Sequence, residues 1–411
     1  MQKRNLLLLS VWQNTQAPCP RTLQLHGYTQ RRMEPNTRAA SRWATPRALA
    51  LPEIWTLVAQ HSGLVGAWRL TGACRASREG ARVWLRTLPG FVVCGGLGRD
   101  GECKSGVWRL DLGELRWEHI GDLALARAYP ACCAVRGGVA MLRGLHTQHR
   151  PGENEPEDCF TASVEFFEHA DSLEVGEQIK SKTLPPLSCG PRVHAAAVPV
   201  HESQSELGQV LLIGGVNIRS GVTPEVHRVD LATGVCTPLP PLLSRERVYC
   251  NAARLPDGRV VCVGNDAEGM TAEILEEVAP DQGSLTGQST WRWREVCGMT
   301  PLRLLFGGCV LGDGRFAVFG GITDRHTNSH TTACEVLTSV NGDDERWEPL
   351  RPMHDARFNF ACAAVGGCVI VAGGESSGSV EVYEEALRQW RQLPCNLPYD
   401  ANIYGVGSAL M

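Results

Sequence analysis

The hydrophobic pattern of this chain repeats a short apolar run that ends on a pair of glycines. Complete copies occur at 91–96 (FVVCGG), 210–215, 316–321 and 369–374, and imperfect copies occur at 139–144 (VAMLRG) and 260–265 (VVCVGN). The second glycines, or their substitutes, are spaced 48, 71, 50, 56 and 53 residues apart. Short apolar runs bounded by glycine predict buried strands. A spacing near 50 residues predicts a repeat architecture rather than one large sheet.

Three further segments recur in phase with these runs. An arginine-led strand-like segment comes before them, and a polar loop and an alternating segment such as VWRLDL (107–112) come after. A tryptophan followed three residues later by an aliphatic residue then ends four of the units, at Trp117, Trp293, Trp347 and Trp390. Four short strands per unit predict one antiparallel sheet. Such a sheet cannot bury both faces alone, whereas six arranged radially can.

With its double glycines, following strands and spaced tryptophans, the chain resembles the kelch family over residues 91–411. The resemblance implies an all-β, six-bladed kelch β-propeller. Blades two and three depart from the pattern, since both carry LPPL (184–187 and 239–242) in place of the tryptophan. Arg143 replaces the first glycine of blade two, and Asn265 replaces the second glycine of blade four. The first glycine-pair strand has no arginine-led partner before it, so we expect the C-terminal strand within 400–411 to complete the first blade.

Glycine clusters also occur in phosphate-binding loops, so an enzymatic reading has to be weighed. A phosphate cradle needs a helix directly after the glycines, and polar loops follow here instead. Kelch-like propellers include a copper radical oxidase, which remains the less favoured alternative because the chain has six tyrosines and no Tyr-His pair. We therefore predict that the protein is not an enzyme, and we assign no catalytic residue, no metal and no cofactor.

The segment at 48–90 predicts a small helical module ahead of the propeller. Pro52 suits the first turn of a helix, and apolar residues recur at helical spacing. The order of Leu-Pro, aliphatic pairs, Cys74-Arg75 and a final tryptophan resembles an F-box, which implies docking onto the adaptor of a cullin–RING ubiquitin ligase. The residues expected to bind that adaptor are Leu51, Pro52, Ile54, Leu57, Val58, Leu64 and Trp68. The alternative is a helical cap that packs on the side of the propeller.

Charge and cysteine content narrow the class of protein. The net charge of −4 argues against nucleic-acid binding by bulk electrostatics, and no apolar run is long enough for a membrane span. The 17 cysteines form no Cys-x-x-Cys pair and many lie in apolar runs, which favours thiols that fill a core in a reducing compartment. We therefore expect a cytoplasmic or nuclear protein.

Residues 1–47 differ in composition from the rest. They hold eight basic residues against the single acid Glu34. We interpret them as a disordered basic tail or as an extension ahead of a start at Met33. An Arg-rich, acid-poor segment is also compatible with organellar targeting.

The arginine-led segments predict a binding surface at one face of the ring. Their first position holds Arg127, Arg192, Arg247, Arg303 and Arg357, with Asn402 in the closing strand. Two residues later stand Tyr129, His194, Tyr249, Leu305, Asn359 and Tyr404. The kelch resemblance implies that both phases surround the mouth of the central channel. We predict that these residues, Leu305 excepted, bind a protein substrate through an acidic peptide segment. The alternative for the arginines is that they bond loop carbonyls or neighbouring acids. The predicted function is that of a substrate receptor of an SCF-type ubiquitin ligase, the alternative being a kelch scaffold without a ligase link.

Overall fold

The computed structural model describes residues 48–411 apart from 149–156, 170–178, 180, 201–204, 218–220, 245–246, 266–268, 279–289, 300–301, 325–328, 339–344, 376 and 400–402. The predicted tail at 1–47 and Asn402 lie outside the described residues. In the described part, no helix is long and apolar enough to cross a membrane.

Six four-stranded antiparallel sheets, the blades, follow the helices. Blade 1 contains β28 (Gly407–Leu410), β1 (Phe91–Cys94), β2 (Gly106–Asp111) and β3 (Arg116–Asp122), and blade 2 contains β4 (Ala131–Val135), β5 (Gly138–Gln148), β6 (Glu157–Glu168) and β7 (Lys182–Leu184). Blade 3 contains β8 (Ala196–Val200), β9 (Gln209–Ile213), β12 (Val226–Asp230) and β13 (Cys236–Leu239), and blade 4 contains β14 (Val248–Arg254), β15 (Val260–Asn265), β16 (Met270–Val278) and β17 (Thr290–Met299). Blade 5 contains β18 (Gly307–Val310), β19 (Phe316–Phe319), β22 (Cys334–Thr338) and β23 (Arg346–Leu350), and blade 6 contains β24 (Ala361–Val365), β25 (Cys368–Ala372), β26 (Ser379–Glu384) and β27 (Gln389–Asn396). Two short ribbons pair β10 (Val216–Asn217) with β11 (Gly221–Val222) and β20 (Ile322–Asp324) with β21 (Ser329–His330).

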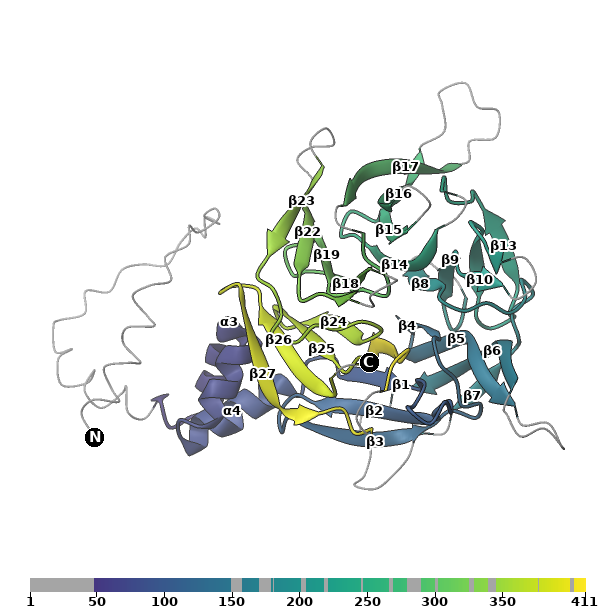
Figure 1. Ribbon diagram of the computed structural model, residues 1–411. Coiled ribbons are helices and arrows are strands. Elements are labelled where there is room, and N and C mark those ends of the chain that lie inside the picture. The colour runs from purple at the N-terminus through teal and green to yellow at the C-terminus, as the bar shows by residue number, and fades with distance from the viewer. Residues whose placement is uncertain are drawn as a thin grey trace, which may run out of the picture. The chain divides into compact units, whose positions relative to one another are not determined.

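The blades close into a ring around a central axis (Figure 1). The first strands of neighbouring blades contact one another in the order β4, β8, β14, β18, β24, β28 and back to β4. In blade 1, β28 pairs with β1 from Cys94↔Gly407 to Phe91↔Leu410, so the C-terminal strand completes the first blade. The predicted six-bladed propeller, closed by its C-terminal strand, is confirmed.

The apolar runs form the second strand of each blade, where both faces of the sheet are covered. Strands β1, β15, β19 and β25 are buried at every position, because neighbouring blades pack on each side. Strand β27, on the outside of its blade, alternates between exposed and more buried positions. The continuous apolar pattern of the second strands is therefore a consequence of their place between two neighbouring sheets.

The glycine pairs bring each second strand close to the next blade. Gly95 and Gly96 both have left-handed backbones, with φ of 61° and 112°. A Cβ on Gly95 would lie 2.3 Å from the carbonyl oxygen of Arg127 in blade 2. Gly96 donates its N–H to that oxygen at 2.8 Å, and Gly321 repeats this bond to Arg357 at 2.7 Å. The glycines are needed for blade packing, because a side chain at a position such as Gly95 would clash with the backbone of the next blade.

Two helices precede the ring and pack on blades 6 and 1. Helix α3 (Pro52–Thr71) is interrupted at Gly63, which has φ of 68°, and helix α4 (Arg75–Leu85) follows. Helices α3 and α4 cross closely at Gly80, where a Cβ would lie 2.2 Å from the carbonyl oxygen of Pro52. Leu64 is fully buried in a cluster with residues of both blades, and Trp68 Nε1 donates to the carbonyl oxygen of Leu112 at 2.6 Å.

Candidate functional site

The arginine that leads each inner strand lies inside its blade rather than at the surface. Arg127, Arg192, Arg247, Arg303 and Arg357 are at most 4% exposed. Each pairs with a glutamate from the same blade, as in Arg247 Nη2–Glu273 at 2.6 Å and Arg357 Nη2–Glu381 at 2.7 Å. The other pairs are Arg127–Glu165, Arg192–Glu225 and Arg303–Glu335.

These ion pairs hold the backbone together at the start of a blade. Arg357 Nη1 donates to the carbonyl oxygens of Gly373 at 2.9 Å and Ser379 at 2.7 Å. Glu381 accepts the N–H groups of His354 and Asp355 from the linker that enters the blade. Burial raises the pKa of Glu381, but the hydrogen bonds from Arg357 and these N–H groups outweigh it and leave the pKa below its usual value.

The burial of the arginines contradicts the prediction that they bind an acidic peptide. Their donors are directed at glutamates and carbonyl groups of their own blades, which is the alternative considered from the sequence. The signal for their partners was present in the sequence, since a glutamate stands at one register position of the third strand in four blades. Glu165, Glu273, Glu335 and Glu381 each pair with the residue two positions before the first glycine or its substitute.

Two residues after each arginine, the chain turns through a left-handed residue that lines the channel. Tyr129, His194, Tyr249, Leu305 and Asn359 all have φ between 52° and 55°. This conformation is uncommon for residues other than glycine, and it directs these side chains toward the axis. Together with Gly405 they form a ring of six residues, one per blade, which we call the mouth ring.

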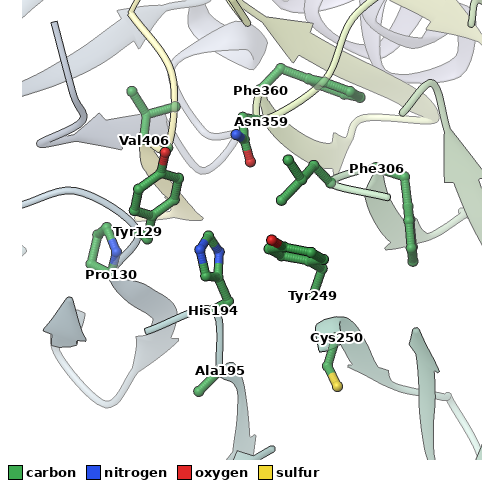
Figure 2. A pocket seen from close by; sticks show the side chains of 12 residues that line it. Tyr129, Pro130, His194, Ala195, Tyr249, Cys250, Phe306, Asn359, Phe360 and Val406 are labelled. Carbon is green, nitrogen blue, oxygen red and sulfur yellow. The ribbon is translucent and has the colours of Figure 1, made fainter. Parts of the chain in front are cut away.

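The mouth ring lines a cavity of about 130 Å³ at the axis. Figure 2 shows Tyr129, His194, Tyr249 and Asn359 projecting toward its middle. On one half of the ring the aromatic side chains are in contact, with centroids 4.3 Å apart for Tyr129–His194 and 4.7 Å apart for His194–Tyr249. On the other half the backbones are bonded, since Asn359 N donates to Leu305 O at 2.9 Å and Gly405 N donates to Asn359 O at 3.2 Å. The cavity therefore has an aromatic side and a side of smaller residues.

The lining of this cavity carries no positively charged group at neutral pH. Its twelve lining residues include no Lys, Arg, Asp or Glu. Burial lowers the pKa of His194 to about 4, so its imidazole is neutral at pH 7. Burial also raises the pKa of Tyr129, so its phenol stays protonated. The cavity therefore offers aromatic faces and hydrogen-bonding groups, but no cation for an acidic ligand.

The register of the closing strand differs from the prediction by one residue. In blade 2, Ala131 pairs with Leu142, which lies two residues before the second glycine of that blade. In blade 1, the residue two positions before the second glycine is Cys94, and it pairs with Gly407. Gly405, with φ of 65°, therefore takes the mouth-ring position that was predicted for Tyr404.

Tyr404 instead stands where Ala128 stands in blade 2, and it bridges to Leu97 as Ala128 bridges to Leu145. Its ring centroid lies 6.5 Å from that of Tyr129, beside the mouth ring rather than in it. By the same register Ile403, and not Asn402, occupies the arginine position. The sequence alignment could not detect this shift, because Asp400-Ala401 of the closing segment resembles Asp355-Ala356 of blade 6 but lies one residue farther from the strand that follows.

The residues predicted to bind an adaptor divide into two groups. Leu64 and Trp68 pack against the propeller, which contradicts a role in adaptor binding for these two. Leu51, Ile54, Leu57 and Val58 remain on the surface of α3 and the residue before it, at 51%, 37%, 55% and 37% exposure. Pro52 is half-buried in the first turn of α3. The four exposed residues form an apolar row that the propeller does not cover, which we call the α3 row.

In the described part of the chain, no group of three or more His, Cys, Asp and Glu side chains is placed to hold a metal ion.

Comparison with known proteins gives kelch-repeat relatives. No protein-family model matches the chain. It is 30% identical over 126 residues to the putative F-box/kelch-repeat protein At1g27420 of Arabidopsis thaliana, which covers 26% of this chain and 36% of the relative. It is 28% identical over 198 residues to human Kelch-like protein 33, which covers 42% of this chain and 35% of the relative. The matched part thus spans about a third of the length of these relatives.

A solved structure supports the same fold. The structure of YjhT superposes with a TM-score of 0.53 at 12% identity, covering 74% of this chain and 97% of that one. At this identity the likeness concerns the fold alone. The chain is a six-bladed β-propeller with kelch-repeat homologues.

Proposed function

We propose that this protein binds a segment of a partner protein at the mouth ring. The observation that carries the proposal is the convergence of Tyr129, His194, Tyr249 and Asn359 from four blades on one cavity (Figure 2). Aromatic side chains held by a rigid scaffold lose little conformational entropy on binding. The kelch-repeat relatives support a protein-binding role over an enzymatic one.

The chemistry of the cavity favours an uncharged segment of the partner. A carboxylate placed there would lose hydration without gaining a cation, because the arginines of the five blades that carry one are buried and each is paired with a glutamate. Apolar or aromatic side chains can stack on Tyr129 and Tyr249, and peptide groups can bond to Asn359. We therefore replace the acidic peptide predicted from the sequence by an uncharged one.

The test of this mouth is the double substitution Tyr129→Asn and Tyr249→Asn. Asparagine tolerates the left-handed backbone, as Asn359 does at the same position of blade 6. We expect the variant to keep its circular dichroism spectrum and to lose its partners in affinity purification. The matched control is Leu387→Asn, which changes an exposed residue of the turn between β26 and β27. A folded double variant that retains the partners of the control would exclude this mouth.

We further propose that the α3 row docks onto the adaptor of a cullin–RING ligase, which would make the protein a substrate receptor. The row supports this role because it exposes four large apolar side chains on one short segment. The name of the Arabidopsis relative combines an F-box with kelch repeats. The scaffold alternative has no need for an exposed row, since Leu64 and Trp68 already fix the helices to the propeller.

Adaptor binding is tested by co-purification with the adaptor. Leu57→Asp with Val58→Asp should abolish recovery of the adaptor while the propeller stays folded. Leu243→Asp with Leu387→Asp is the matched control, because it places the same two charges at exposed apolar sites of the blades. If the unmutated protein recovers no adaptor, the ligase role is wrong and the scaffold role stands.

A further inference from the structure

The seam between blades 2 and 3 departs from the repeat at three register positions that lie together. Arg143 replaces the first glycine of blade 2. In blade 3, His227 pairs with Leu212 at the register where Glu381 pairs with Val371 in blade 6. Cys236 pairs with Val229 at the register where Trp390 pairs with Tyr383.

The position of Cys236 explains why it meets the preceding linker. In blades 4, 5 and 6 the tryptophan at this position donates its indole N–H to a carbonyl near the end of the previous blade, as Trp390 does to Arg351 at 2.8 Å. In blade 3 the smaller side chain leaves room for Cys189, from the linker between β7 and β8. The backbone fixes this approach, since Ser188 N donates to Gly234 O at 3.1 Å and Cys236 N donates to Ser188 Oγ at 3.0 Å.

The two sulfur atoms are in contact beside a buried guanidinium. Cys189 Sγ lies 2.7 Å from Cys236 Sγ, and Arg143 Nη2 donates to Cys189 Sγ at 2.6 Å. Arg143 is 1% exposed, and its Nε and Nη1 have no partner among the described residues. Both cysteines are only partly buried, so small molecules in solvent can reach them.

Positive charge is in excess at this seam. Arg192 is also buried, and its Nε and Nη1 likewise have no partner in the described part of the chain. Its carboxylate partner Glu225 is 57% exposed, because the usual glutamate position holds His227. The pKa of His227 is lowered by burial and then by Arg192, so this imidazole brings no opposite charge.

A thiolate offsets this excess. The hydrogen bond from Cys189 is the main cause of a lowered pKa at Cys236, and the charge of Arg143 acts in the same direction. The pKa of Cys189 is raised in turn, chiefly because it is the donor in that bond. One sulfur is thus a nucleophile at neutral pH, and the other is a protonated thiol next to it.

We propose that Cys189 and Cys236 form a redox-active dithiol, which a hydroperoxide oxidises to a disulfide between the blade 2–3 linker and the outer strand of blade 3. The Cys236 thiolate attacks one peroxide oxygen, so that an S–O bond forms, the O–O bond breaks and the alkoxide or hydroxide leaves with a proton from solvent. Cys189 sulfur then attacks the sulfenic acid. The S–S bond forms, the S–O bond breaks, and the hydroxide leaves as water with the proton of Cys189. The two sulfurs lose two electrons, and the peroxide gains them.

The pairs Cys94–Cys132 and Cys309–Cys362 are also close, but they lack these features and serve as internal controls. Cys94 and Cys132 are 3.5 Å apart, and Cys309 and Cys362 are 3.9 Å apart. Their contacts include no arginine donor among the hydrogen bonds of the described residues. The pKa values of Cys132 and Cys309 are raised, first by the hydrogen bond to the partner thiol and then by burial.

The experiment treats the reduced full chain with hydrogen peroxide, blocks free thiols with N-ethylmaleimide at timed intervals and identifies cross-linked tryptic peptides by mass spectrometry. The disulfide joins peptides 183–192 and 229–245. We expect it to form about tenfold faster than any Cys309–Cys362 disulfide. Equal rates for the two pairs, or no cross-link between 189 and 236, would overturn the proposal.

A variant tests the role of the cation. Arg143→Gly restores the residue found at this position in the other blades, so the backbone angle is retained. We expect this variant to form the 189–236 disulfide about tenfold more slowly. An unchanged rate would mean that the guanidinium does not activate the pair. If the variant does not fold, as judged by circular dichroism, the proposal is still tested by comparing the rates of disulfide formation of the two cysteine pairs in the unmutated chain.

Discussion

At the scale of single residues, the arginine–glutamate pairs explain most of the polar pattern of the repeat. Each pair joins the start of the inner strand to the third strand or, in blade 3, to the residue directly before it. In blades 2, 4 and 6 the glutamate also receives N–H groups from the incoming linker. Blade 1 lacks the pair and has Ile403 and Trp108 at the corresponding positions. An apolar pair is therefore compatible with the same blade geometry.

Removing the charge of one member of a buried pair should lower the free energy of unfolding more than removing both charges. We expect Glu381→Ala to lower the free energy of unfolding by about 3–5 kcal/mol, because Arg357 would remain buried and uncompensated. The double substitution Arg357→Met and Glu381→Leu should lower the free energy of unfolding by less than Glu381→Ala does. Urea unfolding followed by tryptophan fluorescence measures both. A double variant that is less stable than Glu381→Ala would contradict this account.

The neutral imidazole of His194 predicts a pH dependence of stability. Its folded pKa of about 4 lies below the unfolded value of about 6.5, so the unfolded chain binds the extra proton between these values. His194 should therefore make the protein less stable as the pH falls from 6.5 to 4. In His194→Asn, which preserves the left-handed backbone, the free energy of unfolding should fall less over this range. Identical pH profiles for the two proteins would show that His194 does not titrate as described.

At the scale of elements, the two helices are fixed to the ring by one face and exposed on the other. The sequence pattern predicted helices at 48–90, but it could not show which apolar residues face the propeller. Leu64 and Leu57 look equivalent in the sequence, yet one is fully buried and the other is 55% exposed. The break at Gly63, where φ is 68°, lies between them.

The close helix crossing gives a test of this packing. Gly80→Ala places a Cβ too near the backbone of α3, so the helices must separate. We expect faster hydrogen–deuterium exchange in residues 52–85 with unchanged exchange in blades 3–5. Gly72→Ala is the control, because its nearest neighbour, the carbonyl oxygen of Arg69, would be 3.7 Å away. Equal exchange in the two variants would argue against close contact at Gly80.

At the scale of the whole molecule, the period of the glycine pairs was sufficient to predict the propeller and its closure. The mouth ring was predicted in part, since its phase was visible in five blades. The role of the arginines was not predicted correctly, because a position in the sequence does not reveal whether a cation faces solvent or a glutamate of the same sheet. The shift in the closing strand was missed because the sequence comparison assigned the mouth-ring position to Tyr404, which is adjacent to Gly405, the residue that occupies it.

Closure of the ring depends on one short strand. Deleting residues 407–411 should remove β28 and expose the edge of β1. We expect a lower melting temperature and self-association in size-exclusion chromatography. A truncated protein that stays monomeric and melts at the original temperature would show that the pairing of β28 with β1 contributes little.

The pairing of β28 with β1 also determines how long blade 1 remains incomplete while the chain is being synthesised. Strand β1 leaves the ribosome early, but its partner is made more than 300 residues later. At translation rates of about 5–20 residues per second, this delay lasts roughly 15–60 seconds. During that time blade 1 has three strands and an unpaired apolar edge next to the nascent chain. A newly made chain therefore passes through a long interval in which general chaperones have a binding surface that the finished propeller no longer presents.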